Sequence, residues 1–254
     1  MRAAVITIAG ISSRFNKGIP EDEKVLKAIY TDGNAADTLL ARLLAKVSYA
    51  DRIVIVGGYR YADLTRFFEE NLKKDYPQAY LVENPHYADL ASGYSLWLGV
   101  DDALNAGADE VLFVEGDLDI DDASFSTVVE ASGSVLTYTS EPIYADKAVV
   151  LYRDADGRYR YAFNRDHGML RIDEPFSCIL NSGQTWKFTD AGALRRAAKA
   201  FMEQDRGDTN LGIIRRYIDD IDPASIELVF LKRWTNCNTK EDYLSIRKNW
   251  RSDK

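Results

Sequence analysis

The sequence predicts an α/β protein with a mostly parallel central sheet and helices on both faces. Short apolar runs alternate with segments whose apolar residues recur at helical spacing through the first half of the chain. These runs are apolar at nearly every position, which is typical of strands that are buried on both faces of a sheet. After about residue 132 the alternation gives way to short strands that follow one another. The second pattern predicts an antiparallel insertion in the parallel fold.

The elements of the first half follow from these patterns. We expect strands over residues 3–8, 52–56, 79–82 and 110–114, the second of which reads RIVIV and ends at Gly57-Gly58. Helices are expected over residues 35–47, 61–72 and 95–104, where leucines and other apolar residues are spaced three or four apart. Strand and helix therefore alternate regularly up to the acidic segment EGDLDIDD.

The second half begins with short strands, expected over residues 135–138, 148–153 and 158–163, with Asp156-Gly157 as a hairpin turn between the last two. Helices are expected over residues 191–203 and 210–219, and a strand over residues 226–231. Asn238 or Thr239 would cap a last helix. We find no linker or repeat, so residues 1–254 are expected to form one domain, with the insertion at about 132–190.

Composition and charge exclude several classes of protein. The net charge of −8 is unfavourable for general nucleic-acid binding, which requires a basic face. Cys178 and Cys237 lie far apart and outside any zinc-binding spacing, and two histidines are too few for a histidine metal cluster. The first apolar run is too short for a signal peptide, and no run approaches the ~20 residues of a membrane span. We therefore expect a cytoplasmic protein that binds no membrane.

The loop after the first strand carries groups that suit a polyphosphate. Gly10, Ser12 and Ser13 offer backbone amides and hydroxyl groups, and Arg14 and Lys24 offer positive charge. Loops at the carboxyl ends of strands are where open α/β sheets bind their ligands. The loop contains neither the GxxxxGK[ST] nor the GxGxxG pattern. An ordinary strand-to-helix turn with solvated charges is the alternative.

Four segments resemble nucleotidyltransferases with a Rossmann-like GT-A fold. The stretch AGISSRF, followed by Lys24 in EKVL, is similar to their signature AGx[GS]xR(F/M)…K, and its Ser-Ser-Arg form is most similar to the molybdopterin-type enzymes. NPHYADLASGYSLWLG resembles a segment of the phosphocholine cytidylyltransferases. FVEGDLDID occupies the place of that family's metal-binding aspartate, and NCNTKEDY resembles its C-terminal element. The resemblance runs in order from residue 3 to about 245.

The resemblance implies a reaction and a nucleotide-binding loop. A phosphate or phosphonate oxygen would attack the α-phosphorus of a nucleoside triphosphate and release pyrophosphate, so catalysis would consist mainly of positioning and charge neutralisation. The loop Ala9-Gly10 with Ser12 and Ser13 would hold the triphosphate, and Arg14 and Lys24 would be the catalytic cations.

The resemblance also implies a magnesium site. Asp117 is the expected ligand, because Mg²⁺ commonly takes one or two carboxylates together with substrate phosphates. A helix-capping or turn role for the DLDIDD segment is the alternative, and Asp119 could support Asp117 without contacting the metal or could be the ligand in its place. Asn238 stands where many relatives have an aspartate, so it is expected to be a neutral metal ligand, a helix cap, or a sign of weak metal binding.

The base and acceptor sites are assigned by resemblance to other positions. Asn84 and Ser92 would lie near the base, for which cytidine is preferred. An aromatic box would suit a choline or aminoethyl cation, and Tyr94 and Trp186 are the acceptor-binding residues that we expect. Further candidates are Tyr144 and Trp234, and Arg165 or His167 for the acceptor phosphate. Packing in the core or exposure on a surface loop is the alternative for each of these residues.

These observations favour a Mg²⁺-dependent cytidylyltransferase that transfers CMP from CTP to phosphocholine or 2-aminoethylphosphonate. A sugar-1-phosphate nucleotidyltransferase is the nearest alternative. A glycosyltransferase of the same fold would use DLD at 117–119 as its DxD element, and a non-catalytic nucleotide-binding module would explain Asn238. The oligomeric state stays open, with a homodimer as one option.

Overall fold

The computed structural model describes residues 1–146, 148–164 and 168–252, with side chains up to Trp250. Its centre is one nine-stranded sheet, in which seven strands follow the order β10-β6-β9-β4-β1-β2-β3. These strands are β1 (Arg2–Thr7), β2 (Arg52–Gly57), β3 (Ala79–Glu83), β4 (Glu110–Glu115), β6 (Ser134–Thr139), β9 (Phe176–Phe188) and β10 (Ile226–Leu231). All neighbours along this order pair in parallel except β9, which runs antiparallel between β4 and β6.

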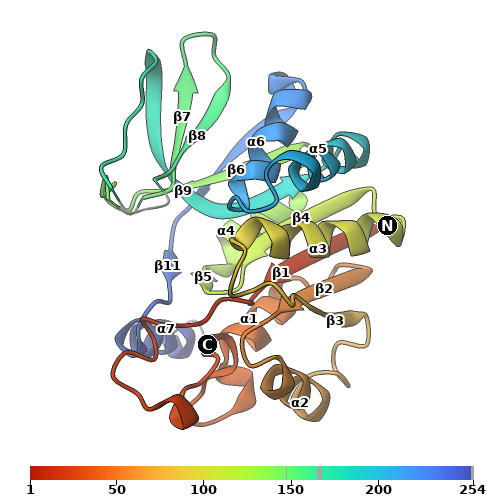
Figure 1. The fold of residues 1–254 in the computed structure, drawn as a ribbon, viewed down its shortest axis with the longest axis vertical. Helices are drawn as coiled ribbons and strands as arrows, with labels where there is room; N and C mark the ends of the chain where they lie inside the picture. The colour runs from red at the N-terminus through yellow and green to blue at the C-terminus, as the bar shows by residue number, and fades with distance from the viewer. Residues whose placement is uncertain (147, 165–167, 253–254) are drawn as a thin grey trace.

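Helices cover both faces of this sheet, which confirms the predicted fold class (Figure 1). One face packs against α3 (Ser92–Asn105), α5 (Ala191–Gln204) and α6 (Leu211–Asp220), and the other against α1 (Leu39–Lys46), α2 (Tyr61–Asn71) and α4 (Asp122–Glu130). Alternate residues of β1 divide between these faces: Ala3 and Val5 join the first core cluster, and Ala4 and Ile6 join the second. Burial on both sides explains why β1 is apolar at consecutive positions.

The expected helix over residues 35–47 is divided in two. A short 3-10 helix, η3 (Ala35–Asp37), precedes α1, and the Thr38 side chain caps α1 by accepting a hydrogen bond from the Ala41 amide. Three further 3-10 segments are η1 (Glu21–Glu23), η2 (Lys27–Ile29) and η4 (Pro223–Ser225). Thr38 favours the break because its hydroxyl satisfies an amide that the first helical turn leaves unpaired.

The expected antiparallel hairpin is present as β7 (Val150–Asp154) and β8 (Tyr159–Ala162), with Gly157 at a φ of +81° in the turn. It projects from one end of the molecule (Figure 1). The sequence did not predict β9, a 13-residue strand that pairs with β7 at its first part and with β6 and β4 further on. The segment at about 132–190 therefore contributes to the central sheet as well as to the hairpin.

A second, two-stranded sheet was also not predicted from the sequence. It pairs β5 (Leu118–Ile120) with β11 (Trp234–Asn236) in antiparallel register, and we call it the ribbon. Helix α7 (Lys240–Ser252) follows the ribbon and lies beside the segment that connects β1 to α1 (Figure 1). Each ribbon strand has only three residues, which is too short for a periodic sequence pattern.

Among the described helices, none combines the length and the apolar composition that a membrane crossing requires. Both cysteines are free thiols, with Cys178 exposed and Cys237 buried. Burial raises the pKa of the Cys237 thiol to about 12, so this group is protonated at neutral pH.

Candidate active site

A cleft of 370 Å³ opens at the carboxyl ends of β1, β3 and β4. Its walls come from the segments that directly follow these strands, which is where open α/β sheets place their ligands. The lining residues include Ala9, Gly10, Ser12, Ser13, Arg14, Lys27, Asn84, Tyr87, Ser92, Glu115, Asp117 and Asn238. The cleft thus brings together the predicted nucleotide loop, one predicted catalytic cation and both predicted metal ligands.

The nucleotide loop is held in shape by Asn16. The Asn16 side chain donates to the carbonyls of Ser12 (3.1 Å) and Val25 (2.8 Å) and accepts from the Val25 amide (3.0 Å), and only 3% of its surface is exposed. Ser12 has a φ of +54°, in the left-handed region that glycine adopts most readily and that is uncommon for other residues. Its hydroxyl accepts from the Lys27 amide (3.4 Å), which brings the returning chain under the loop.

Lys27 crosses the cleft to Asp117. The Lys27 ammonium group donates to Asp117 Oδ2 (2.6 Å) and to the Cys237 carbonyl (2.9 Å). Both side chains of the ion pair are only about one-fifth exposed. Charges with restricted access to water interact more strongly than surface charges do. This pair links the nucleotide loop, β4 and the C-terminal segment at one point.

Lys24 is not in the cleft, contrary to our expectation. Its ammonium group pairs with Glu21 (2.5 Å) three residues earlier, and this hydrogen bond raises the pKa of Lys24. Lys27 occupies the position that we had assigned to Lys24. The sequence held a signal for this difference: Lys24 follows three consecutive acidic residues, whereas Lys27 is flanked by apolar residues that the structure buries. Arg14 does line the cleft, and it has no ion-pair partner among the described residues.

Asp117 and Asn238 each present a free oxygen. Asp117 Oδ1 and Asn238 Oδ1 are both buried, and neither has a hydrogen-bond partner within the described part of the chain. Asn238 does not cap α7: Thr239 Oγ1 accepts from the Asp242 amide (3.1 Å), and Asp242 accepts from the amides of Asn238 and Thr239. Buried oxygen atoms normally find a partner. One carboxylate and one amide oxygen fit a Mg²⁺ ion that takes its other ligands from substrate phosphates.

The remaining aspartates of the acidic segment have structural partners. Asp119 is only 2% exposed and accepts a hydrogen bond from the Trp250 indole (2.6 Å), so it is not a further metal ligand at the cleft. Asp121 caps α4 by accepting from the Ser124 amide (2.9 Å), as the capping alternative predicted. No group of three or more His, Cys, Asp or Glu side chains converges to hold a metal in residues 1–146, 148–164 and 168–250.

Glu115 is a second carboxyl group in the cleft, which sequence reasoning missed. It accepts a hydrogen bond from the Asn210 side chain (2.6 Å), and Asn210 is itself 5% exposed. Burial of the carboxyl group, reinforced by the charge of Asp117, raises the pKa of Glu115 to about 8. Its spacing of two from Asp117 was the available signal, because alternate residues of an extended chain share a side.

The two residues expected near the base, Asn84 and Ser92, both line the cleft but differ in exposure and in hydrogen bonding. Asn84 is 1% exposed. Its side chain donates to Ser95 Oγ (2.8 Å) and accepts from the His86 backbone amide (2.8 Å), so it forms part of the cleft wall. Ser92 is exposed, and its hydroxyl accepts from the Asn210 amide (3.1 Å). Tyr87 also lines the cleft and was not predicted.

The predicted aromatic box is not assembled at this cleft. Trp186 is 1% exposed, stacks on Phe113 with ring centroids 5.1 Å apart and donates to the Tyr161 hydroxyl, so it belongs to the core. Tyr94 does not line the cleft and packs edge-on against His86. Trp186 is therefore a core residue, and Tyr94 packs on His86 and Trp97, so neither side chain lines the cleft where we expected it.

The other acceptor candidates are also placed away from the cleft or not described. Trp234 is on β11 and donates to the Gly183 carbonyl (2.8 Å), and Tyr144 is a largely exposed residue outside the cleft lining. Arg165 and His167 lie outside the described residues. The acceptor side of the cleft therefore gains no aromatic residue from the predicted set.

Comparison with solved structures shows which known folds this chain shares. The inositol-1-phosphate CTP transferase from T. maritima is 15% identical with a TM-score of 0.67, over 98% of this chain and 95% of that chain. A putative glucose-1-phosphate thymidylyltransferase from Bacillus anthracis is 13% identical with a TM-score of 0.68, over 99% and 96%. The CTP:phosphocholine cytidylyltransferase from Streptococcus pneumoniae is 17% identical with a TM-score of 0.60, over 98% and 99%.

No curated protein matches the sequence. Residues 23–250 match a protein family whose description reads "Domain of unknown function (DUF6564)". This match spans nearly all of the chain, from the loop that carries Lys27 to the helix that carries Trp250. The chain therefore belongs to the DUF6564 family, and its fold is the one seen in the solved nucleotidyltransferases.

Proposed function

We propose that this protein is a Mg²⁺-dependent nucleotidyltransferase that transfers CMP from CTP to phosphocholine or 2-aminoethylphosphonate and releases pyrophosphate. The observation that carries the proposal is the Lys27–Asp117 pair in a cleft that also contains the Arg14 loop. The shared fold with solved CTP transferases supports it.

The residues of the cleft suit an anionic nucleophile that needs no strong base. The amides of the Gly10 to Ser13 loop would bind the phosphates of the nucleotide, and Arg14 would offset charge on the departing pyrophosphate. Lys27 would move from Asp117 to the α-phosphate. There its three N–H groups can donate to the phosphate oxygens on which negative charge develops in the transition state. The reaction exchanges one phosphoanhydride bond for another, so positioning and charge neutralisation are the main requirements.

Asp117 and Asn238 would hold the magnesium ion through the oxygens that have no protein partner. When bound, the ion would neutralise phosphate charge and align the triphosphate. Lys27 holds only Asp117 Oδ2, so Oδ1 remains for the ion. Because Asn238 contributes no charge, we expect weaker metal binding than a pair of carboxylates would give.

Two alternatives make different use of the same cleft. A sugar-1-phosphate acceptor is favoured by the fold shared with the putative glucose-1-phosphate thymidylyltransferase and by the missing aromatic box. A glycosyltransferase with DLD as its metal element is disfavoured, because Asp119 is buried against Trp250.

A pyrophosphate-release screen tests the proposal. The four nucleoside triphosphates are each combined with phosphocholine, 2-aminoethylphosphonate and a panel of sugar 1-phosphates in the presence of Mg²⁺. We expect release with CTP and one of the two amino-alcohol or aminophosphonate acceptors. Release only with a sugar phosphate would favour the first alternative, and nucleotide binding without release from any pair would contradict the proposed activity.

A further inference from the structure

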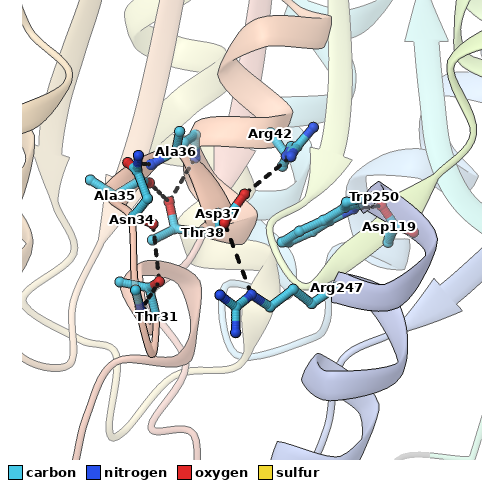
Figure 2. Close-up of polar contacts among 12 residues, drawn as sticks. Thr31, Asn34, Ala35, Ala36, Asp37, Thr38, Arg42, Asp119, Arg247 and Trp250 are labelled. Atoms are coloured by element: carbon cyan, nitrogen blue, oxygen red, sulfur yellow. Dashed lines mark hydrogen bonds and ion pairs between the residues drawn. The ribbon is translucent and has the colours of Figure 1, made fainter. Parts of the chain in front are cut away.

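The cleft depends on a contact that lies behind it. Asp119 is two residues from Asp117 on the chain, but its carboxylate points away from the cleft to helix α7. The Trp250 indole donates a hydrogen bond to this carboxylate, as Figure 2 shows. The distance from Nε1 to Oδ1 is 2.6 Å. Asp119 and Trp250 are 2% and 4% exposed, so the hydrogen bond to a charged group is shielded from water.

The ribbon is attached to the rest of the fold by side-chain contacts: Trp234 donates to the Gly183 carbonyl on β9 (2.8 Å), and Asp119 binds Trp250. It consists of β5 and β11 alone and does not pair with the large sheet. Leu118 and Ile120 fix one face of β5 in the core, at 1% and 0% exposure. Alternation places Asp119 on the opposite face of β5, where α7 covers it, whereas Asp117 lies in the turn before β5 and lines the cleft. On that face the polar partners of Asp119 include the Trp250 indole at 2.6 Å and the more distant Arg233 guanidinium (Nε to Oδ2, 3.8 Å).

Helix α7 is itself anchored to the segment before α1. Arg247 forms ion pairs with Asp32 and Asp37. Arg42 also pairs with Asp37 (Nη2 to Oδ1, 3.2 Å), and its guanidinium lies 4.9 Å from the centre of the Trp250 ring. Figure 2 shows Asp37 between the two arginines. These contacts fix the depth and rotation of the indole. Trp250 therefore acts on β5 from a rigid support.

We propose that Trp250 is a positioning residue for Asp117. By binding Asp119, Trp250 fixes the rotation of β5. This rotation in turn keeps the Asp117 carboxylate paired with Lys27 and directed at the position that the metal would occupy. The same ribbon carries the chain to Asn238, and the Cys237 amide donates to the Asp117 carbonyl (2.8 Å), so both metal oxygens move with it. This inference rests on the proposed function in one respect, namely that Asp117 binds a metal ion. The position of Asp117 relative to Lys27 can be measured without turnover.

The main experiment measures the reactivity of individual lysines toward an amine-acylating reagent, quantified by mass spectrometry. Trp250→Phe keeps a ring and removes the N–H donor. Asp119→Leu removes the hydrogen-bond acceptor and keeps a side chain of similar volume. With two variants, the inference can still be tested if one of them is unstable. We expect acylation of Lys27 to rise severalfold in both variants, because Asp117 no longer holds its ammonium group, while partly exposed Lys24, which pairs with Glu21, reacts as in the wild type. Asp119→Asn retains an oxygen for the indole and should react nearly as the wild type does.

Asp154→Asn is the matched control, since Asp154 is also a buried carboxylate (5% exposed) with arginine and backbone partners but lies in the projecting hairpin. It should leave Lys27 unchanged. Unchanged acylation of Lys27 in Trp250→Phe and Asp119→Leu would overturn the inference, as would an equal rise in Asp154→Asn, which would indicate general loosening.

A second measurement uses Mn²⁺ as a paramagnetic probe in the presence of CTP, read by electron paramagnetic resonance. Loss of a group that orients a metal ligand typically weakens metal binding at least tenfold, so we expect about that change in Trp250→Phe. Mn²⁺ affinity equal to that of the wild type would contradict the inference. If the wild type releases no pyrophosphate in any pairing but Lys27 still responds to the variants, the proposed function fails and the positioning role stands.

Discussion

Lys27 and Lys24 are three residues apart, but their ammonium groups have different surroundings and should have different importance. Lys24 pairs with Glu21 at the surface, where an exposed ion pair contributes little to stability. Lys27 is held by Asp117 and by a backbone carbonyl inside the cleft. A cation at such a point can move to a bound phosphate without crossing open solvent.

We expect Lys27→Ala to lower kcat by about 100-fold or more, the usual effect of removing a group that stabilises charge in the transition state. Lys24→Ala should lower it less than about threefold, since its partner is a surface acid. Steady-state kinetics of pyrophosphate release compares the two variants. An equal loss of kcat in the two variants, or a larger loss in Lys24→Ala, would indicate that Lys24 is a catalytic cation, as we first expected.

Glu115 should make stability depend on pH. Its pKa is raised from 4.5 to about 8 in the folded state, so between these values the folded protein keeps a proton that the unfolded chain releases. The free energy of unfolding should therefore fall as the pH rises from 4.5 to 8. Glu115→Gln removes this contribution while retaining an oxygen for Asn210.

The variant should thus gain stability relative to the wild type as the pH rises, by up to about 4 kcal/mol across this window, since one pKa unit corresponds to about 1.4 kcal/mol. Urea unfolding of both proteins at pH 5 and pH 8 measures the difference. Parallel changes in the two proteins would show that Glu115 ionises normally.

At the scale of elements, the cleft depends on how closely α3 approaches the sheet. Gly99 lies in the middle of α3, and a Cβ atom there would come within 2.3 Å of a Val5 methyl group on β1 and 3.2 Å of one on β2. Val5 is buried in the central strand and has little freedom to move. The missing side chain lets α3 pack directly against the strands, which sets the position of its first turn at the cleft.

Gly99→Ala should destabilise the protein by about 1 to 3 kcal/mol, because overpacking outweighs the gain in helix propensity of about 1 kcal/mol. Gly192→Ala in α5 is the matched control. A Cβ atom at Gly192 would lie 3.2 Å from the capping carboxylate of Asp190 and 3.4 Å from the Arg196 guanidinium, which can move more easily than a buried valine, so that variant should lose less stability than Gly99→Ala. Thermal unfolding measures both. Stabilisation by Gly99→Ala would show that α3 can withdraw from the sheet.

At the scale of the whole molecule, the two core clusters share the strands that separate them. Residues of β1, β2 and β4 contribute to both, and the third cluster joins the nucleotide loop to α7 through Phe15 and Tyr243. If the helices left one face of the sheet, they would expose apolar side chains of strands that are still packed on the opposite face. This arrangement favours cooperative unfolding.

We therefore expect differential scanning calorimetry to show one main unfolding transition, at the same temperature as the loss of tryptophan fluorescence. Trp186 and Trp250 lie in the first and third clusters, so the fluorescence reports on both regions. Two separated transitions would indicate that the α7 region unfolds independently of the sheet.

The expected elements show where sequence patterns are informative. The runs at 3–8, 52–56 and 110–114 correspond to β1, β2 and β4, because burial on both faces leaves a continuous apolar signal. The missed elements lack such a signal. The ribbon strands are three residues long, and β9 contains polar residues such as Asn181 and Lys187 whose side chains bond to carbonyls outside the strand.

The sequence by itself determined the α/β class, the position of the loop after β1 and the acidic segment after β4, since each depends on neighbouring residues. Tertiary structure decided which charged groups meet: Lys27 instead of Lys24 faces Asp117, and Asp119 binds Trp250 across 131 positions of the chain. Pairing of this kind depends on distances and burial in three dimensions, and local sequence patterns do not encode them.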